Sequence, residues 1–248
     1  MGDIEELRNK HLGERCFVIG TGPSLKKMDL SLMKNDITIG CNLIGRIFTP
    51  DYLCASDPNV YAQHKSEIDS YDCKHKIFAG PGSQYPLKNI LEDSYQVAIK
   101  DWDIKKLPGS FAGNMKELPS SGGNVIMDLC LPLAHYMGIK EIYLVGCDCT
   151  AGHFYTPWSL KTSVSYFLGL LRILLSFNRH YFLQMLNSYY IPGKPYEWDL
   201  IECRYQYRQR LFYEAVKEIF EKDNRKIYNA GVGGILEVFE RVDYYSLF

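Results

Sequence analysis

Residues 16–25, CFVIGTGPSL, join an apolar run to a turn whose residue types can bind a ligand. The two glycines can bring backbone N–H groups close to an anion, and Ser24 adds a hydroxyl donor. The turn is not a dinucleotide fingerprint, because Leu25 stands where the third glycine belongs. It is not a Walker loop either, because Lys26 follows leucine. Two interpretations stay open, a phosphate-binding turn and an ordinary strand-to-loop turn, for Gly20, Thr21, Gly22, Pro23 and Ser24.

A second candidate anion site is the segment 119–125, PSSGGNV, which precedes an apolar-faced helix predicted over 124–138. Serine and asparagine are N-cap residue types, and glycines let a ligand approach the helix N-terminus, where the helix dipole favours anions. An ordinary helix cap explains the same pattern equally well. The candidate anion-binding residues here are Ser121, Gly122, Gly123 and Asn124.

Residues 146–157, GCDCTAGHFYTP, place Asp148 and His153 five residues apart, directly after the strongest strand signal of the chain. A carboxylate and an imidazole can share general acid–base work on a reacting hydroxyl. A lone histidine is more often structural, but this one follows a strand end, and His180 is kept as a reserve candidate. Cys147 and Cys149 lack a second Cys or His pair at zinc spacing, so we expect no metal site on that pattern.

Short apolar runs alternate with helical patterns along the chain. Runs of this length and near-continuous apolar character are typical of parallel strands that are buried on both faces. We therefore expect an α/β fold, a doubly wound, Rossmann-like and mostly parallel sheet in a single domain over 1–248. The expected strands are 16–20, 37–42, 51–57, 75–80, 141–148 and 225–231, and the main expected helices are 124–138, with a kink at Pro132, and 204–225.

Small and polar residues end nearly every expected strand, and ligands of open α/β sheets lie at the carboxyl ends of the strands. The segment 159–195 does not fit this alternation, because it is rich in Leu, Phe and Tyr but is interrupted by polar residues and is too broken to span a bilayer. We expect a helical insertion there. Its alternatives are a hairpin that covers the sheet, a lid, an oligomer interface and a membrane-surface contact.

The balance of 28 basic and 29 acidic residues gives a net charge of −1, which argues against nucleic acid as a partner. Cysteines within apolar runs favour free thiols in a reducing compartment, and the charged N-terminal stretch has no apolar signal-peptide core. The expected location is the cytoplasm, with a peripheral position at the inner face of the membrane as an alternative.

Several of these motifs resemble known families. The N-terminal half, with GERCFVIGTGPSLKKMDLSLMKND, GCN and PDYLCASDPNVY, resembles bacterial sialyltransferases that use CMP-activated sugars. It looks closer still to bacterial and archaeal proteins grouped with archaeal hydroxymethylpterin diphosphokinase, many of which are encoded for surface-glycan assembly. HYMGIKEIYLVGCD is similar to both groups, while HFYTP and the C-terminal RKIYNAGVGGILEVFERVDYYSLF resemble the second in particular.

The resemblance implies roles for individual residues. The Gly-x-Gly-Pro-Ser loop would lie against the nucleotide phosphate and ribose, with Thr21 where the sialyltransferases have asparagine. Asn42 matches their asparagine after the second strand, and Asp57 falls where they have another nucleotide-contacting asparagine. Ser121 and Gly122 match their Ser-Gly before the helix. Their general base is a histidine after a lid, and this chain has Glu197 and Asp199 near that place and no histidine over 181–248.

The leading hypothesis is glycosyl transfer from a nucleotide-activated sugar, a CMP-sugar by resemblance, to a glycan or lipid-linked acceptor in surface polysaccharide biosynthesis. The candidate catalytic residues are His153, Asp148 and Asp199. The first alternative is diphosphate transfer from ATP to a hydroxymethylpterin-like alcohol, which would want Mg²⁺ on carboxylates such as Asp57 and Asp148. The second alternative is a non-catalytic module that binds a nucleotide sugar or a glycan. A homo-oligomer is a further expectation for the insertion.

Overall fold

The computed structural model describes residues 2–100, 114–119, 124–149, 153–154, 200–234 and 236–248, with the backbone alone for 200–208. Its centre is a sheet of nine described strands in the order β6-β5-β4-β3-β2-β1-β7-β8-β9, in which every described pair is parallel. The strands are β1 Arg15–Ile19, β2 Ile37–Cys41, β3 Tyr52–Ala55, β4 His75–Ala79, β5 Tyr95–Lys100, β6 Glu117–Pro119, β7 Glu141–Val145, β8 Lys226–Asn229 and β9 Glu240–Arg241.

The strand sequences explain why this sheet is buried on both faces. In β1, Phe17, Val18 and Ile19 are fully buried although their side chains point alternately to opposite faces. Central strands between two layers of helices need apolar residues at every position. The expected doubly wound α/β fold is therefore confirmed, and each of the six predicted strands overlaps an observed strand.

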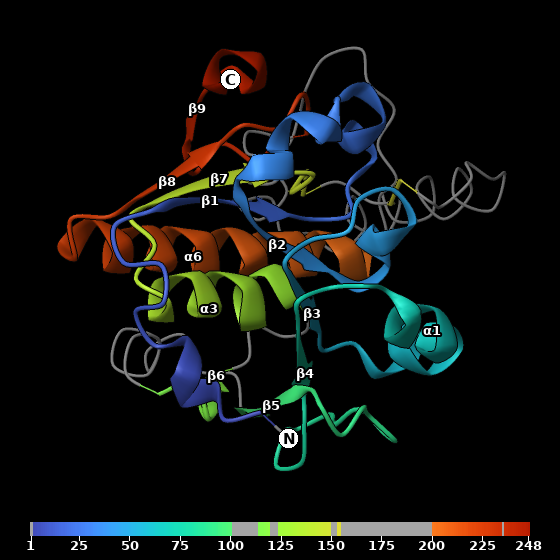
Figure 1. The fold of residues 1–248 in the computed structure, drawn as a ribbon. Coiled ribbons are helices and arrows are strands. Elements are labelled where there is room, and N and C mark those ends of the chain that lie inside the picture. The colour runs from blue at the N-terminus through green and yellow to red at the C-terminus, as the bar shows by residue number, and fades with distance from the viewer. Residues whose placement is uncertain (1, 101–113, 120–123, 150–152, 155–199, 235) are drawn as a thin grey trace, which may run out of the picture.

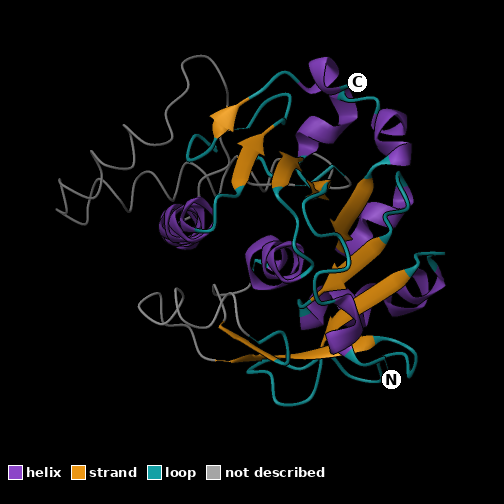
Figure 2. Cartoon of the chain, turned by 60° about the vertical axis from the view of Figure 1, so that its left-hand side comes forward, coloured by secondary structure: helices purple, strands orange, loops and turns teal. Residues whose placement is uncertain are grey.

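Helices lie on both faces of the sheet (Figure 2). Figure 1 shows α3, Leu131–Tyr136, and α6, Leu200–Lys222, side by side on one face. The other helices of the described residues are α1, Pro58–Ser70, a π-helical segment at Ile126–Cys130, and short 3-10 helices at Ile4–Leu7, Pro23–Lys27, Leu30–Asn35, Asn42–Arg46 and Tyr244–Leu247. The apolar side chains of both layers form one core with the strands.

Pro132 distorts its helix as the sequence predicts, and the form of the distortion is a π-helical segment, Ile126–Cys130, directly before α3. Leu131 donates its N–H to the carbonyl of Ile126, five residues earlier. Proline has no N–H with which to continue the ladder, so the change in hydrogen-bond pattern falls where the proline interrupts it.

Three described strands and one described α-helix were not among the predicted elements: β5, β6, β9 and α1. The edge strands β6 and β9 are two or three residues long and carry too little pattern to be recognised. The start of α1 has a clear signal in retrospect, because Asp57 is an N-cap type and Pro58 suits the first helical position.

Candidate functional site

The strand order reverses direction between β1 and β7, because the chain adds β2 to β6 on one side of β1 and β7 to β9 on the other. The carboxyl ends at such a switch point are where open α/β sheets bind ligands. We call the two loops that meet there, residues 20–24 and 146–148, the β1/β7 junction.

Backbone groups hold the two loops of the β1/β7 junction together. Gly20 donates its N–H to Val145 over 2.8 Å, and Gly22 donates to Gly146 over 2.7 Å. A Cβ atom on Gly20 would lie 2.3 Å from the Gly146 oxygen, and one on Gly22 would lie 2.5 Å from Asp148 Cγ. The glycines are thus required for the close approach of the loop after β7.

Asp148 lies inside this junction and accepts two hydrogen bonds from one residue. The Ser24 N–H donates to Oδ2 over 2.8 Å, and the Ser24 hydroxyl donates to Oδ1 over 2.5 Å. Both residues are 5% exposed. The amides of Gly20, Gly22 and Ser24 therefore bind acceptors of the chain itself. A role of these residues in nucleotide binding stays a prediction.

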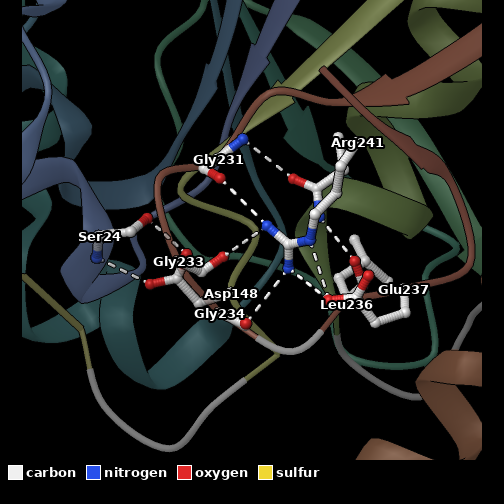
Figure 3. Close-up of polar contacts among 9 residues, drawn as sticks. Ser24, Asp148, Gly231, Gly233, Gly234, Leu236, Glu237 and Arg241 are labelled. Carbon is white, nitrogen blue, oxygen red and sulfur yellow. Dashed lines mark hydrogen bonds and ion pairs between the residues drawn. The ribbon is translucent and has the colours of Figure 1, made fainter. Parts of the chain in front are cut away.

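The loop between β8 and β9 closes the junction from a third side (Figure 3). The Arg241 guanidinium donates to the carbonyls of Gly231, Gly233 and Gly234 over 3.1–3.2 Å, and to Glu237 Oε1 over 2.7 Å. Gly234 has a φ of +74° and approaches Asp148 so closely that a Cβ atom would lie 2.6 Å from Asp148 Cα. Arg241 thus fixes the loop whose backbone packs on Asp148.

The electrostatics of Asp148 follow from this enclosure. Burial raises the pKa of its carboxyl above the usual range, while the hydrogen bonds from Ser24 and the charges of Arg241 and Lys27 act in the opposite direction. The net direction is upward, so desolvation outweighs the partners. Asp148 is therefore placed to position the loops of the junction.

His153 lies next to the β1/β7 junction and touches it through Thr21. The Thr21 Oγ1 and His153 Nδ1 atoms are 2.8 Å apart, and the Phe154 N–H donates to the Thr21 carbonyl over 2.8 Å. Part of the His153 side chain is exposed to solvent. Desolvation by the surrounding residues nevertheless lowers the pKa of its imidazole, while the Asp57 carboxylate acts in the opposite direction. The imidazole is therefore mainly neutral at pH 7, the form in which it can take up a proton.

The next two strands along the sheet end in a different way, and we call Asn42, Ser56 and Asp57 the β2/β3 rim. Asn42 follows β2 with a φ of +50°, a backbone conformation that asparagine tolerates. Ser56 follows β3 and is 9% exposed. Within the described part of the chain, two buried side-chain oxygen atoms have no hydrogen-bond partner, namely Asn42 Oδ1 and Ser56 Oγ. Asp57 caps α1, with Oδ1 accepting from the N–H groups of Asn59 and Val60.

Comparison with known proteins adds a family to this geometry. The family model described as "6-hydroxymethylpterin diphosphokinase MptE-like" matches residues 2–153, which is more than half of the chain. The chain belongs to the MptE-like family. The match covers β1 to β7 and ends at His153, so it includes the β1/β7 junction and the β2/β3 rim.

A solved structure is similar to this MptE-like chain at the level of overall shape. It is a variant of the sialyltransferase CST-II, crystallised in complex with CMP, with a TM-score of 0.49 and 17% sequence identity over 92% of this chain and 86% of that chain. No curated protein sequence matches the chain. None of the helices in the described ranges combines the length and the apolar character that crossing a membrane requires.

Several predicted site residues of this MptE-like chain fall outside the described residues. They are Ser121, Gly122, Gly123 and Asp199, together with Glu197, His180 and the insertion 159–195. Their roles stay predictions. Asn124 is described, and its Oδ1 accepts the Ile126 N–H over 3.0 Å, as an N-cap does.

Sequence reasoning missed Ser56 and Arg241, for different reasons. Ser56 lies near the end of the expected strand 51–57, but nothing in the sequence distinguishes a hydroxyl with a partner from one without. Arg241 lies 93 residues after Asp148, and only the fold brings its loop to the junction. The glycines at 231, 233 and 234 were the available signal, because three glycines so close together indicate a tight approach of backbone.

The two carboxylates named above for Mg²⁺, both among the described residues, are engaged by other groups. Asp148 accepts from Ser24 with both oxygens, and Asp57 uses Oδ1 to cap α1. Mg²⁺ demands near-ideal octahedral geometry and one or two carboxylate ligands with free lone pairs. The donor set fits the ion poorly as it stands, because one carboxylate is enclosed and the other offers a single oxygen.

Proposed function

We propose that this MptE-like protein is a nucleotide-dependent transferase whose ligand lies at the carboxyl edge of β1, β2, β3 and β7. Its donor is a nucleotide-activated sugar of the CMP type, and its acceptor is a hydroxyl of a glycan or lipid-linked glycan. The observation that carries the proposal is the Thr21–His153 pair at the switch point, beside Asp57 and two strand ends with unpartnered polar atoms.

His153 supplies the base in this proposal. When Thr21 Oγ1 accepts the proton of Nδ1, the imidazole presents its lone pair at Nε2. That nitrogen takes the proton of the acceptor hydroxyl while the oxygen attacks the anomeric carbon of the sugar. The bond from that carbon to the phosphate oxygen breaks, CMP leaves with the electron pair, and the glycosidic bond forms. The lowered pKa of His153 supports this role, because the base starts in its neutral form.

The engagement of Asp57 and Asp148 favours sugar transfer over diphosphate transfer. A phosphoryl transfer from ATP is helped by divalent cations that bridge the phosphates, and these cations need carboxylate ligands. Here one carboxylate accepts two bonds from Ser24 and the other caps a helix. Sugar transfer releases CMP, which carries a single phosphate. Diphosphate transfer releases AMP and moves two further phosphates, so more negative charge has to be neutralised in that reaction.

The family description favours a second candidate, the diphosphokinase reaction. In that reaction the alcohol oxygen of a hydroxymethylpterin attacks the β-phosphorus of ATP, AMP leaves, and the alcohol proton passes to a base such as His153. The same base in the same place would therefore serve both reactions. The two reactions differ in the donor, which is a CMP-sugar in one and ATP in the other.

Two assays on the full-length protein distinguish the candidates. The first incubates it with CMP-sugars in EDTA and measures released CMP by chromatography. The second incubates it with ATP, 6-hydroxymethyl-dihydropterin and MgCl₂ and measures AMP. Metal-independent CMP release that falls in His153→Ala but not in His64→Ala, a control at a half-buried histidine of α1, supports sugar transfer.

AMP release that requires both the pterin and Mg²⁺ would contradict sugar transfer and support the diphosphokinase reaction. Binding of CMP without turnover of any donor, with or without acceptor glycans, would identify the protein as a binding module and overturn the catalytic role of His153.

A further inference from the structure

We propose that Thr21 is a positioning residue for His153, which orients the imidazole and holds its proton at Nδ1. The inference deepens the proposed function and rests on it for the reaction in which His153 takes part. It starts from two contacts of Thr21. Its Oγ1 atom lies 2.8 Å from His153 Nδ1, and its carbonyl accepts the Phe154 N–H over 2.8 Å.

Thr21 is itself held in place by the β1/β7 junction. Gly20 and Gly22, on either side of Thr21, donate their N–H groups to carbonyls at the end of β7. Thr21 is 7% exposed, and its branched Cβ restricts the rotation of its hydroxyl group about χ1. The Oγ1 atom therefore has a fixed position relative to the end of β7, from which the chain continues toward His153.

Phe154 fixes the backbone next to His153. Its side chain is 7% exposed and belongs to the hydrophobic core, while its N–H is bound by the Thr21 carbonyl. With the backbone fixed, the imidazole can still rotate about its two side-chain torsions. The contact between Nδ1 and Thr21 Oγ1 selects one orientation, in which Nε2 points away from the loop after β1.

The same contact bears on the tautomer of the imidazole. A neutral imidazole carries its proton on one ring nitrogen and a lone pair on the other, and a threonine hydroxyl can either donate or accept. A base that acts through Nε2 needs the proton at Nδ1, so Thr21 Oγ1 must accept it. A valine at this position could not accept a hydrogen bond, whereas a serine could. The identity of residue 21 should therefore decide which tautomer is populated.

Nitrogen NMR of the ligand-free protein with ¹⁵N-labelled histidine reads the tautomer directly, and His153→Ala assigns its signals. We expect the Nδ1–H form in the wild type and in Thr21→Ser, and a mixture of both tautomers in Thr21→Val. Thr38→Val is the matched control, since Thr38 is 2% exposed and its hydroxyl donates to Asp51 Oδ2 over 3.0 Å, near the amino end of β2. It should leave the tautomer unchanged. An Nε2–H form in the wild type, or the same tautomer in Thr21→Val, would overturn the proposal.

Steady-state kinetics with a CMP-sugar donor separate positioning of the base from contact with the nucleotide. Thr21→Val should lower kcat roughly 10–100-fold, the order of loss that a misplaced catalytic group causes, with the KM of the donor nearly unchanged. Thr21→Ser should restore most of kcat, because it keeps the hydroxyl. A raised KM with an unchanged kcat in Thr21→Val would show that Thr21 binds the nucleotide and does not position His153.

The two measurements distinguish failure of this inference from failure of the proposed function, because the NMR experiment needs neither donor nor acceptor. A tautomer that depends on Thr21, without release of CMP from any CMP-sugar, supports the positioning role and refutes sugar transfer. Release of CMP together with a tautomer that does not depend on Thr21 supports sugar transfer and refutes the positioning role.

Discussion

The β1/β7 junction and the β2/β3 rim lie at the same edge of one sheet, yet they handle their polar groups in opposite ways. In the junction, Ser24 satisfies both oxygens of Asp148, and Arg241 binds three carbonyls of the loop that packs beside it. At the rim, Asn42 Oδ1 and Ser56 Oγ are buried without partners. A closed hydrogen-bond network makes the junction rigid, while the rim keeps two buried polar atoms whose hydrogen-bonding capacity is unused within the described residues.

This difference predicts two kinds of variant. Changes in the junction should cost stability first, and function only through the loops that move. Changes in the residues that face the ligand should cost binding or turnover while the free energy of unfolding stays nearly constant. The four predictions below run from the largest expected effect to the smallest.

His153→Ala should reduce donor turnover by about 10²–10⁴-fold, because general acid–base catalysis contributes about that much. His153 is exposed, so the free energy of unfolding should change little. Steady-state kinetics and urea denaturation of the same preparation measure both quantities. A large loss of stability without a loss of turnover would show that His153 has a structural role in the β1/β7 junction and no role in catalysis.

Gly20→Ala should destabilise the protein by about 3 kcal/mol, the upper range for an added methyl group in a packed interior. The new Cβ would lie 2.3 Å from the Gly146 oxygen, which is backbone and cannot rotate away. Urea denaturation measures the loss. Gly13→Ala is the control, because nothing lies within 4 Å of the Gly13 Cβ position and only its positive φ opposes a side chain, so it should cost about 1 kcal/mol. Equal costs would refute the close packing of the junction.

Asp148→Ala should cost about 2 kcal/mol, because it leaves the Ser24 N–H and hydroxyl buried without an acceptor. Ser24→Ala should cost about 1 kcal/mol, since the backbone bond to Oδ2 stays. The double variant should cost less than the sum, because the two residues share one interaction. A double-mutant cycle by urea denaturation measures this coupling, and strictly additive losses would show that Ser24 and Asp148 do not act as a pair.

The pH dependence of turnover should report His153. Its folded-state pKa lies below the ordinary value of 6.5, so the neutral base persists as the pH falls through that value. We expect kcat/KM to be constant above about pH 6.5 and to fall only at lower pH, with an apparent pKa below that of free histidine. The same lowered pKa means that folding stability from this group is present above the unfolded-state pKa and declines as the pH drops below it. An apparent kinetic pKa above 6.5 would contradict the assignment.

Much of the fold could be predicted from the sequence, because its determinants are local. Apolar runs such as CFVI and IYLV predict buried parallel strands. Pro132 predicts a break in its helix whatever that helix packs against. Asp57-Pro58 also marks a helix start, although the resemblance predicts a nucleotide contact for Asp57. The short edge strands β6 and β9 could not be predicted, because two or three residues do not make a pattern.

For the site, the sequence by itself determined which residue types stand at the strand ends, since the order of apolar runs and turns places them there. It therefore predicted that Ser24, Asn42, Asp57, Asp148 and His153 belong to the same edge. Only the tertiary structure decided which of them bind each other. The Ser24 amide could serve a phosphate or a carboxylate equally well by type, and in the structure it binds the carboxylate of Asp148. The Gly20 and Gly22 amides bind carbonyls of the β7 strand end instead. Hydrogen bonding depends on distance and direction across the sheet, which residue order alone does not contain.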